Sequence, residues 1–141
     1  MSPLEKAAAI VECEQTIHRF YAALDDSDFE TVANTIAEDG VWHRQGKVLK
    51  GPAAVRAALA ERPAGRITAH MMQNMVVDVR GPDEADVRYI ALVYRYDAPP
   101  GATGPAPLDT LLSISVYRDR LKRAADGRWL IEEMRSSRRF G

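Results

Sequence analysis

Cysteine is almost absent from this sequence, and the motifs that mark metal and nucleotide sites are missing altogether. The single cysteine, Cys13, has no partner for an internal disulfide, and Glu12 and Glu14 on either side of it disfavour a reactive thiolate. No pair of histidines or cysteines has metal-ligand spacing, and neither a glycine-rich phosphate loop nor a Gly-x-Ser-x-Gly motif occurs. We therefore expect no metal and no cofactor.

The sequence also lacks a charge excess of either sign and any long apolar run. The formal net charge is -1, so no electrostatic field favours nucleic acid or an anionic membrane. No stretch approaches the length of a membrane span, and the first residues have neither the basic start nor the apolar run of a secretory signal. The expectation is a cytoplasmic protein with no nucleic-acid partner and no membrane partner.

What is present is a chain of ordinary apolar content whose first half predicts three helices. Apolar side chains recur every three or four residues from Leu4 to Leu24, as on one face of an amphipathic helix. A second helix is expected from about Ser27 to Asp39, and a third over 51–62. The inward face of the second helix is predicted to carry Phe29, Val32, Ala33 and Ile36.

The remaining segments predict β structure. A short hairpin is expected over 41–49, with its turn at Gln45-Gly46. Four longer strands follow, at 68–79, 85–96, 110–122 and 128–135. Because most of the connections are short, neighbouring strands should be antiparallel, and the layout is that of one α+β domain over residues 1–141. Strands this long should form a strongly curved sheet that, with the helices, encloses a pocket.

Two ionisable residues stand out as candidates for chemistry at that pocket. Asp25 ends the first helix, on the side of its apolar stripe, and His70 lies early in the first long strand. Strand alternation predicts that His70, Met72, Asn74 and Val76 share one face. Asp25 and His70 are read either as a general acid–base dyad or as a structural hydrogen bond that ties the helix to the sheet.

Aromatic residues supply the remaining wall candidates. Trp42, on the hairpin, is expected in the core or the pocket wall, and His43 on the surface. Tyr94 and Tyr96 share a strand face and either line the pocket or fill the core, while Arg95 should point the other way to solvent. The segment 97–109, rich in proline and glycine, is read either as a lid over the cavity or as an exposed connector.

Five short motifs are spread over nearly the whole chain. They are Phe-Tyr-Ala-Ala-Leu-Asp-Asp-Ser-Asp-Phe (20–29), Ile-Ala-Glu-Asp-Gly-Val-Trp (36–42), Gly-Pro-Ala-Ala-Val (51–55), His-Met-Met-Gln-Asn (70–74) and Asp-Gly-Arg-Trp (126–129). Together they resemble the SnoaL-like branch of the NTF2-like superfamily. The resemblance implies a cone: three N-terminal helices on a strongly curved mixed or antiparallel sheet. It also implies a homodimer that pairs through the outer sheet face, which the alternation of residues 111–117 permits.

For activity, the resemblance is to scytalone dehydratase and lindane dehydrochlorinase in the positions of Asp25 and His70. In those enzymes the two residues abstract a proton, which implies that they meet in the pocket here. Phe20 stands where the dehydrochlorinase has lysine, and Leu24 where the dehydratase has tyrosine, so neither specific reaction is implied.

The leading hypothesis is therefore a cofactor-independent lyase of the dehydratase type, or an isomerase. Its substrate would be a small, largely apolar, possibly cyclic molecule. His70 would act as base with Asp25 supporting it. The alternative is a non-catalytic binding protein for a small hydrophobic molecule, or an accessory subunit like the β subunit of a dioxygenase. The residues expected to bind substrate are Tyr21, Trp42, Met72, Asn74, Tyr94 and Tyr96.

Overall fold

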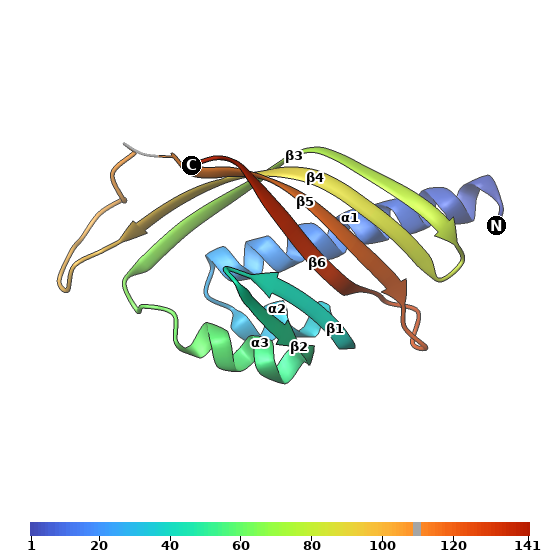
Figure 1. Ribbon diagram of the computed structural model, residues 1–141, viewed down its shortest axis with the longest axis horizontal. Helices are drawn as coiled ribbons and strands as arrows, with labels where there is room; N and C mark the ends of the chain where they lie inside the picture. Colours follow the sequence, from blue (N-terminus) through green and yellow to red (C-terminus); the bar gives the residue numbers. More distant parts are fainter. Residues whose placement is uncertain (109–110) are drawn as a thin grey trace.

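A six-stranded sheet bends over a long N-terminal helix in the computed structural model, which describes residues 1–108 and 111–141 (Figure 1). The element order is α1 (Pro3–Asp25), α2 (Phe29–Asn34), β1 (Ile36–Arg44), β2 (Lys47–Lys50), α3 (Gly51–Ala60), β3 (Arg66–Gly81), β4 (Glu84–Asp97), β5 (Leu111–Arg123) and β6 (Trp129–Phe140). The strands are ordered β2-β1-β6-β5-β4-β3. The helices lie on the concave side, so the α+β class and the curved sheet predicted from the sequence are confirmed.

Helix α1 forms where the apolar repeat predicts it, and its start is well capped. Ser2 Oγ accepts the backbone N–H of Glu5 at 3.1 Å, and the Glu5 carboxylate accepts the N–H of Ser2 at 2.7 Å. Pro3, at the first helical position, loses no hydrogen bond there. The buried stripe of α1 faces the concave side of the sheet, and its C-terminal end delivers Asp25 to β3.

Helix α2 is shorter than the sequence predicts. Asp28 caps it by accepting the N–H of Thr31 at 3.2 Å, but the helix ends at Asn34 instead of running to Asp39. Ile36 begins β1, which pairs parallel with β6, where it lies opposite Ile131. The expectation that Ile36 belongs to the second helix is therefore wrong, because pairing with a strand about a hundred residues away outweighs the local helical pattern.

The hairpin and the third helix follow the prediction closely. Strands β1 and β2 pair antiparallel, and the turn between them has positive φ at Gln45 (50°) and Gly46 (78°). Two successive positive φ angles match the right-handed twist of a two-residue hairpin. Gly51, at φ 81°, then turns the chain directly into α3, where Pro52 occupies the first turn.

Strands β3 to β6 form the antiparallel meander, and β1 adds to it in parallel, so the sheet is mixed. Each predicted long strand is present, except that residue 110 of the third lies outside the described residues. Strand β3 is interrupted: the register with β4 shifts between Gln73 and Val76, and Asn74 has φ 54°. This bulge shifts the alternation, so Asn74 and Val76 are exposed and do not share the face of His70.

The core fills the space between α1 and the concave sheet face. Cys13 is completely buried there, and burial together with Glu12 and Glu14 raises the pKa of its thiol to about 12. None of the helices in the described ranges is both long enough and apolar enough to span a bilayer. The largest fully buried side chains are Tyr89, Phe20, Ile17, Leu59, Leu121, Ile131, Met134, Val32, Val55, Val87 and Cys13.

Candidate active site

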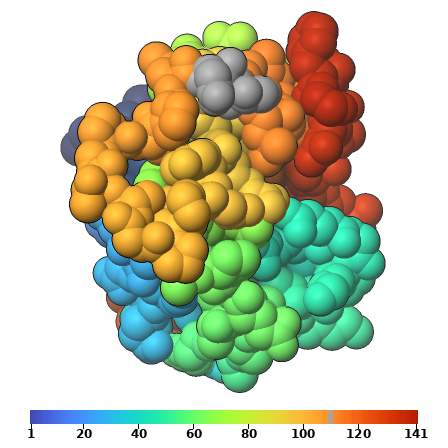
Figure 2. Space-filling model, turned by 90° about the vertical axis from the view of Figure 1, so that its left-hand side faces the viewer, coloured from blue at the N-terminus to red at the C-terminus, as the bar shows by residue number. Residues whose placement is uncertain are grey.

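A cavity of about 560 Å³ opens between the concave sheet face and the β1–β2 hairpin. It is of the size that small-molecule sites usually have. The end of the molecule at which β4, α3 and this hairpin meet faces the viewer in Figure 2. Of the residues expected from the sequence, Tyr21, Trp42 and His70 line the cavity. Other lining residues come from β5, β6 and the segment after α3.

Asp25 is in direct contact with His70, which lines the cavity. Asp25 Oδ1 lies 2.6 Å from His70 Nδ1, and Asp25 Oδ2 accepts the backbone N–H of His70 at 2.8 Å. The carboxylate therefore holds both the ring and the backbone of the same residue. The two side chains are only 11% and 20% exposed, for His70 and Asp25 respectively, so the contact is shielded from bulk water.

Thr68, which the sequence reasoning missed, completes the environment of Asp25. Its hydroxyl donates to Asp25 Oδ1 at 2.8 Å and accepts from Arg62 Nη2 at 2.7 Å. The strand alternation that identifies His70 places Thr68 on the same strand face, and it could have identified Thr68 as a candidate from the sequence. A guanidinium thus supports the carboxylate through one hydroxyl.

The hydrogen bonds to Asp25 fix its charge. Burial raises the pKa of the carboxyl, but donors from the His70 ring, the His70 backbone and Thr68 outweigh burial and hold the pKa below its usual range. An ionised carboxylate can only accept, so Nδ1 of His70 carries the proton of this contact. Nε2 has no hydrogen-bond partner among the described residues and remains available to a molecule in the cavity.

A second polar network lies beneath the cavity floor. The ring of Tyr21 lies beside His70, with centroids 5.0 Å apart, and its hydroxyl is 2.9 Å from that of Tyr89. Tyr89 in turn donates to Asp119 Oδ2 at 2.8 Å and stacks on Tyr117 at 5.1 Å. The sequence pattern does not predict this network, although Tyr89 lies on the strand whose tyrosines are expected in the pocket wall or the core, and Asp119 was missed. Strand alternation along β4 and β5 predicts that these side chains share one sheet face. It does not predict that they contact one another.

Burial dominates the ionisation of this network. It raises the pKa of the Asp119 carboxyl well above its usual value, although the hydrogen bond from Tyr89 lowers it in part. Burial also raises the pKa of both Tyr21 and Tyr89 well above the usual value. Burial therefore favours the neutral form of all three groups, and a neutral carboxyl can donate a hydrogen bond as well as accept one.

Four of the residues expected to bind substrate do not line the cavity. Met72 is half-buried and packs against the core, and Asn74 is exposed at the bulge. Alternation along β4 places Tyr94 and Tyr96 on the convex face, since Val93 and Arg95 line the cavity. Arg95 points away from the two tyrosines as expected, and there it lines the open cavity with a side chain that is 34% exposed.

Two further expectations are changed by the structure. His43 lies at the cavity, with Nε2 3.2 Å from Glu133 Oε2, and is not a simple surface residue. None of the described residues of the 97–109 segment lines the cavity, which favours the exposed connector over the lid; residue 109 itself lies outside the described residues. Within the described ranges, no group of three or more His, Cys, Asp or Glu side chains is placed to hold a metal ion.

Comparison with solved structures supports the same fold. The chain is similar to a protein from Catenulispora acidiphila, at 28% identity and TM-score 0.76, over 94% of this chain and 93% of that one. A structure from that organism in complex with S-DNPA is 27% identical, with TM-score 0.75 and 94% of both chains covered. The hexachlorocyclohexane dehydrochlorinase LinA-type3 from Novosphingobium barchaimii LL02 is 16% identical, with TM-score 0.78, over 99% and 92%.

No curated protein matches the chain. A family model does match, and it covers residues 5–135, which include nearly all of the helices and of the sheet. The expectation drawn from the five motifs is thereby confirmed: the chain belongs to the SnoaL-like domain family, with the NTF2-like fold.

Proposed function

We propose that this chain is a cofactor-independent lyase or isomerase in which His70, supported by Asp25, moves a proton on a small cyclic substrate. The observation that carries the proposal is the 2.6 Å contact between His70 Nδ1 and Asp25 Oδ1 at the wall of the cavity. A carboxylate in this position favours the Nδ1–H tautomer and stabilises the imidazolium that forms when Nε2 accepts a proton.

The proposed step is removal of a proton from carbon next to a carbonyl group. The C–H bond breaks, its electron pair forms an enolate, and the proton moves to His70 Nε2. In a lyase the enolate then expels a leaving group from the β carbon; in an isomerase the proton returns at another carbon. Positioned donors that stabilise the developing oxyanion contribute much of the rate in such reactions. Ser115 and Tyr117 line the cavity and are proposed for this role, since Asn74, Tyr94 and Tyr96 lie outside it.

The cavity also offers a surface for an apolar ring. Tyr21, Leu24, Trp42 and Val93 contribute apolar atoms to its wall. The relative from Catenulispora acidiphila has been solved in complex with S-DNPA, and that supports a small-molecule ligand for this family member too. The likeness to the dehydrochlorinase, at 16% identity, supports only the fold.

Deuterium incorporation tests the proposal without knowledge of the natural substrate. A panel of cyclic ketones such as 2-tetralone, in heavy water, is followed by mass spectrometry for exchange next to the carbonyl. The wild-type chain should accelerate exchange of at least one member. The substitutions His70→Ala and Asp25→Asn should each remove about 10²–10⁴-fold of that rate.

The matched control is His18→Asn, which alters an exposed histidine of α1 that is not part of the cavity wall and should leave the rate unchanged. Circular dichroism verifies that each variant is folded. If exchange in the wild type equals that of folded His70→Ala for every ketone, the dyad is structural. The alternative, a binding or accessory protein, would then stand.

A further inference from the structure

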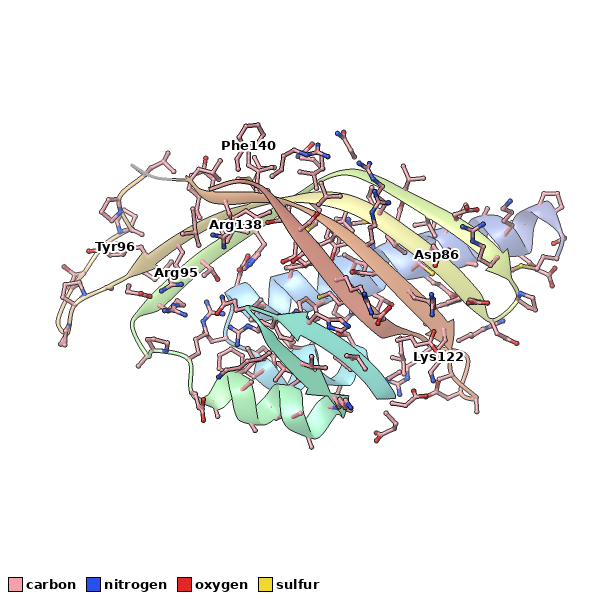
Figure 3. The ribbon with its side chains drawn as sticks, in the orientation of Figure 1. Asp86, Arg95, Tyr96, Lys122, Arg138 and Phe140 are labelled. Carbon is pink, nitrogen blue, oxygen red and sulfur yellow. The ribbon has the colours of Figure 1, made fainter. Side chains whose placement is uncertain are left out.

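The cavity is lined by cations and by no carboxylate. Among the described residues, no aspartate or glutamate is part of its wall. The cationic lining residues are Arg44, Lys47, Arg62, Arg66, Arg95 and Arg138. They converge from the hairpin, from the segment after α3 and from three strands of the sheet, so the fold itself gathers them. Figure 3 shows Arg95 and Arg138 near the same end of the molecule, below the convex surface.

The charges in this group are only partly neutralised. Asp97, outside the wall, pairs with Arg66 at 2.8 Å and with Arg95 at 3.1 Å, so one carboxylate serves two guanidinium groups. Arg44 lies over the ring of Trp42, 5.0 Å from its centroid. Neither Arg44 nor Arg138 has a carboxylate within 4.0 Å in the described part of the chain.

Holding these guanidinium groups together has an energetic cost. Arg66 is only 15% exposed in its side chain, and like charges at such sites repel more strongly than in water. Burial, followed by the charges of Arg66 and Arg95, lowers the pKa of Arg44. Burial and the charge of Arg66 do the same for Arg62. A bound anion would relieve this repulsion, whereas a neutral ligand would not.

We propose that the natural substrate is a small organic anion whose carboxylate is held by Arg44, Arg95 and Arg138. Guanidinium groups match a carboxylate through two parallel hydrogen bonds, which fixes the ligand's orientation as well as its charge. The apolar ring of the same molecule would lie along Trp42 and Leu24, with its reacting carbon toward His70. The sequence leads us to expect a small, largely apolar, possibly cyclic substrate, and the proposal adds an acid group to that molecule.

This inference rests on the proposed function for the orientation of the ligand, but its test measures binding alone. Isothermal titration calorimetry compares three acids with their neutral amides: benzoate and benzamide, cyclohexanecarboxylate and its carboxamide, and 2-naphthoate and 2-naphthamide. For at least one pair, the acid should bind about tenfold more tightly than the amide. Added salt should weaken binding of the acid and leave that of the amide nearly unchanged.

The double variant Arg44→Gln, Arg95→Gln should lose about tenfold in affinity for the acid and less than about twofold for the amide. The control is the double variant Arg118→Gln, Arg120→Gln, which removes the same two charges from exposed positions on the opposite sheet face and should bind like the wild type. No preference for any acid, or a preference that the double variant keeps, would overturn the inference.

The variant His70→Ala separates the two proposals. It should retain the acid preference whether or not His70 is the base, because binding of the anion is assigned to the arginines. If the wild type prefers the acids but does not catalyse deuterium exchange, the proposed reaction is wrong and the substrate class stands. If it catalyses exchange but shows no preference for the acids, only the substrate class is wrong.

Discussion

Asp119 carries a carboxyl group in the core beneath the cavity, where it is only 3% exposed. Its pKa is raised by burial, so the folded protein holds a proton there that the unfolded chain releases at about pH 3.9. A group whose pKa is higher in the folded state contributes fully to stability at pH values below its unfolded-state pKa. That contribution is lost as the pH rises toward the folded-state pKa. The loss is about 1.4 kcal/mol per pH unit within that window.

The substitution Asp119→Asn should therefore flatten the dependence of stability on pH. Asparagine is nearly isosteric and keeps an acceptor for the Tyr89 hydroxyl, but it does not titrate. Urea unfolding at about pH 5 and about pH 8 measures the free energy of unfolding of both proteins. Relative to the wild type, the variant should be more stable at the higher pH than at the lower. Parallel curves for the two proteins would mean that Asp119 is ionised in the folded state.

The reactivity of Cys13 tests how α1 packs against the sheet. It is fully buried and its thiol pKa is raised to about 12, so the thiolate is scarce and shielded. We expect almost no reaction with Ellman's reagent in the native protein and a rapid one in guanidinium chloride. Fast labelling of the native protein would contradict the packing of α1 against the sheet.

Some residues of the candidate site can be predicted from the sequence, and others cannot. Asp25 and His70 were singled out by position and by a family resemblance, and the structure brings them together. Thr68 was not singled out, because the position of its hydroxyl depends on contacts between elements that no local pattern encodes. The arginines of the cavity were missed for the same reason: Arg95 was assigned the correct strand face, but what lies over that face depends on the hairpin.

At the scale of elements, the helices and long strands follow from local periodicity, while the errors occur where pairing is distant. The end of α2 depends on the parallel pairing of β1 with β6. The bulge in β3 shifts the face of every residue after it, and a strict period of two assigns Asn74 and Val76 to the wrong side. The positive φ of Asn74, a residue that tolerates this conformation, is the one local sign of the bulge.

Substitutions at Asn74 test the bulge. Asn74→Gly should change the free energy of unfolding by less than about 0.5 kcal/mol, because glycine adopts positive φ freely. Asn74→Val should destabilise by about 1–2 kcal/mol, since a β-branched residue does not. Denaturant unfolding measures both. Neither variant should alter the rate of deuterium exchange catalysed by the protein. A loss of that exchange in a stably folded Asn74→Gly variant would show that Asn74 does contact the substrate.

At the level of the whole molecule, the outer sheet face through which a homodimer is expected to pair carries different residues from those the sequence pattern suggested. Ser113, Ser115 and Tyr117 line the cavity and are not on the outer face. The convex face instead carries apolar side chains in cross-strand register, where Met71 lies opposite Leu92, Leu92 opposite Ile114, and Ile114 opposite Phe140. Phe140 points away from the helices in Figure 3.

We predict that the chain is a dimer in solution and that pairing uses this convex face. The double substitution Met71→Glu, Ile114→Glu should give a monomer by size-exclusion chromatography with light scattering, because it places charges in the contact. The control is Val11→Glu, an exposed apolar residue of α1, which should remain dimeric. A monomeric wild type, or a dimer in the double variant, would reject this interface.

We propose that Asp25 holds His70 with Nδ1 protonated and Nε2 free toward the cavity. Nitrogen-15 spectra of the histidine side chains measure this directly, with the His70 signals identified by their loss in His70→Ala. The prediction is a neutral Nδ1–H tautomer with a strongly hydrogen-bonded proton, which loses that bond or changes tautomer in Asp25→Asn. An Nε2–H tautomer in the wild type, or spectra that Asp25→Asn leaves unchanged, would show that Asp25 does not set the tautomer of His70.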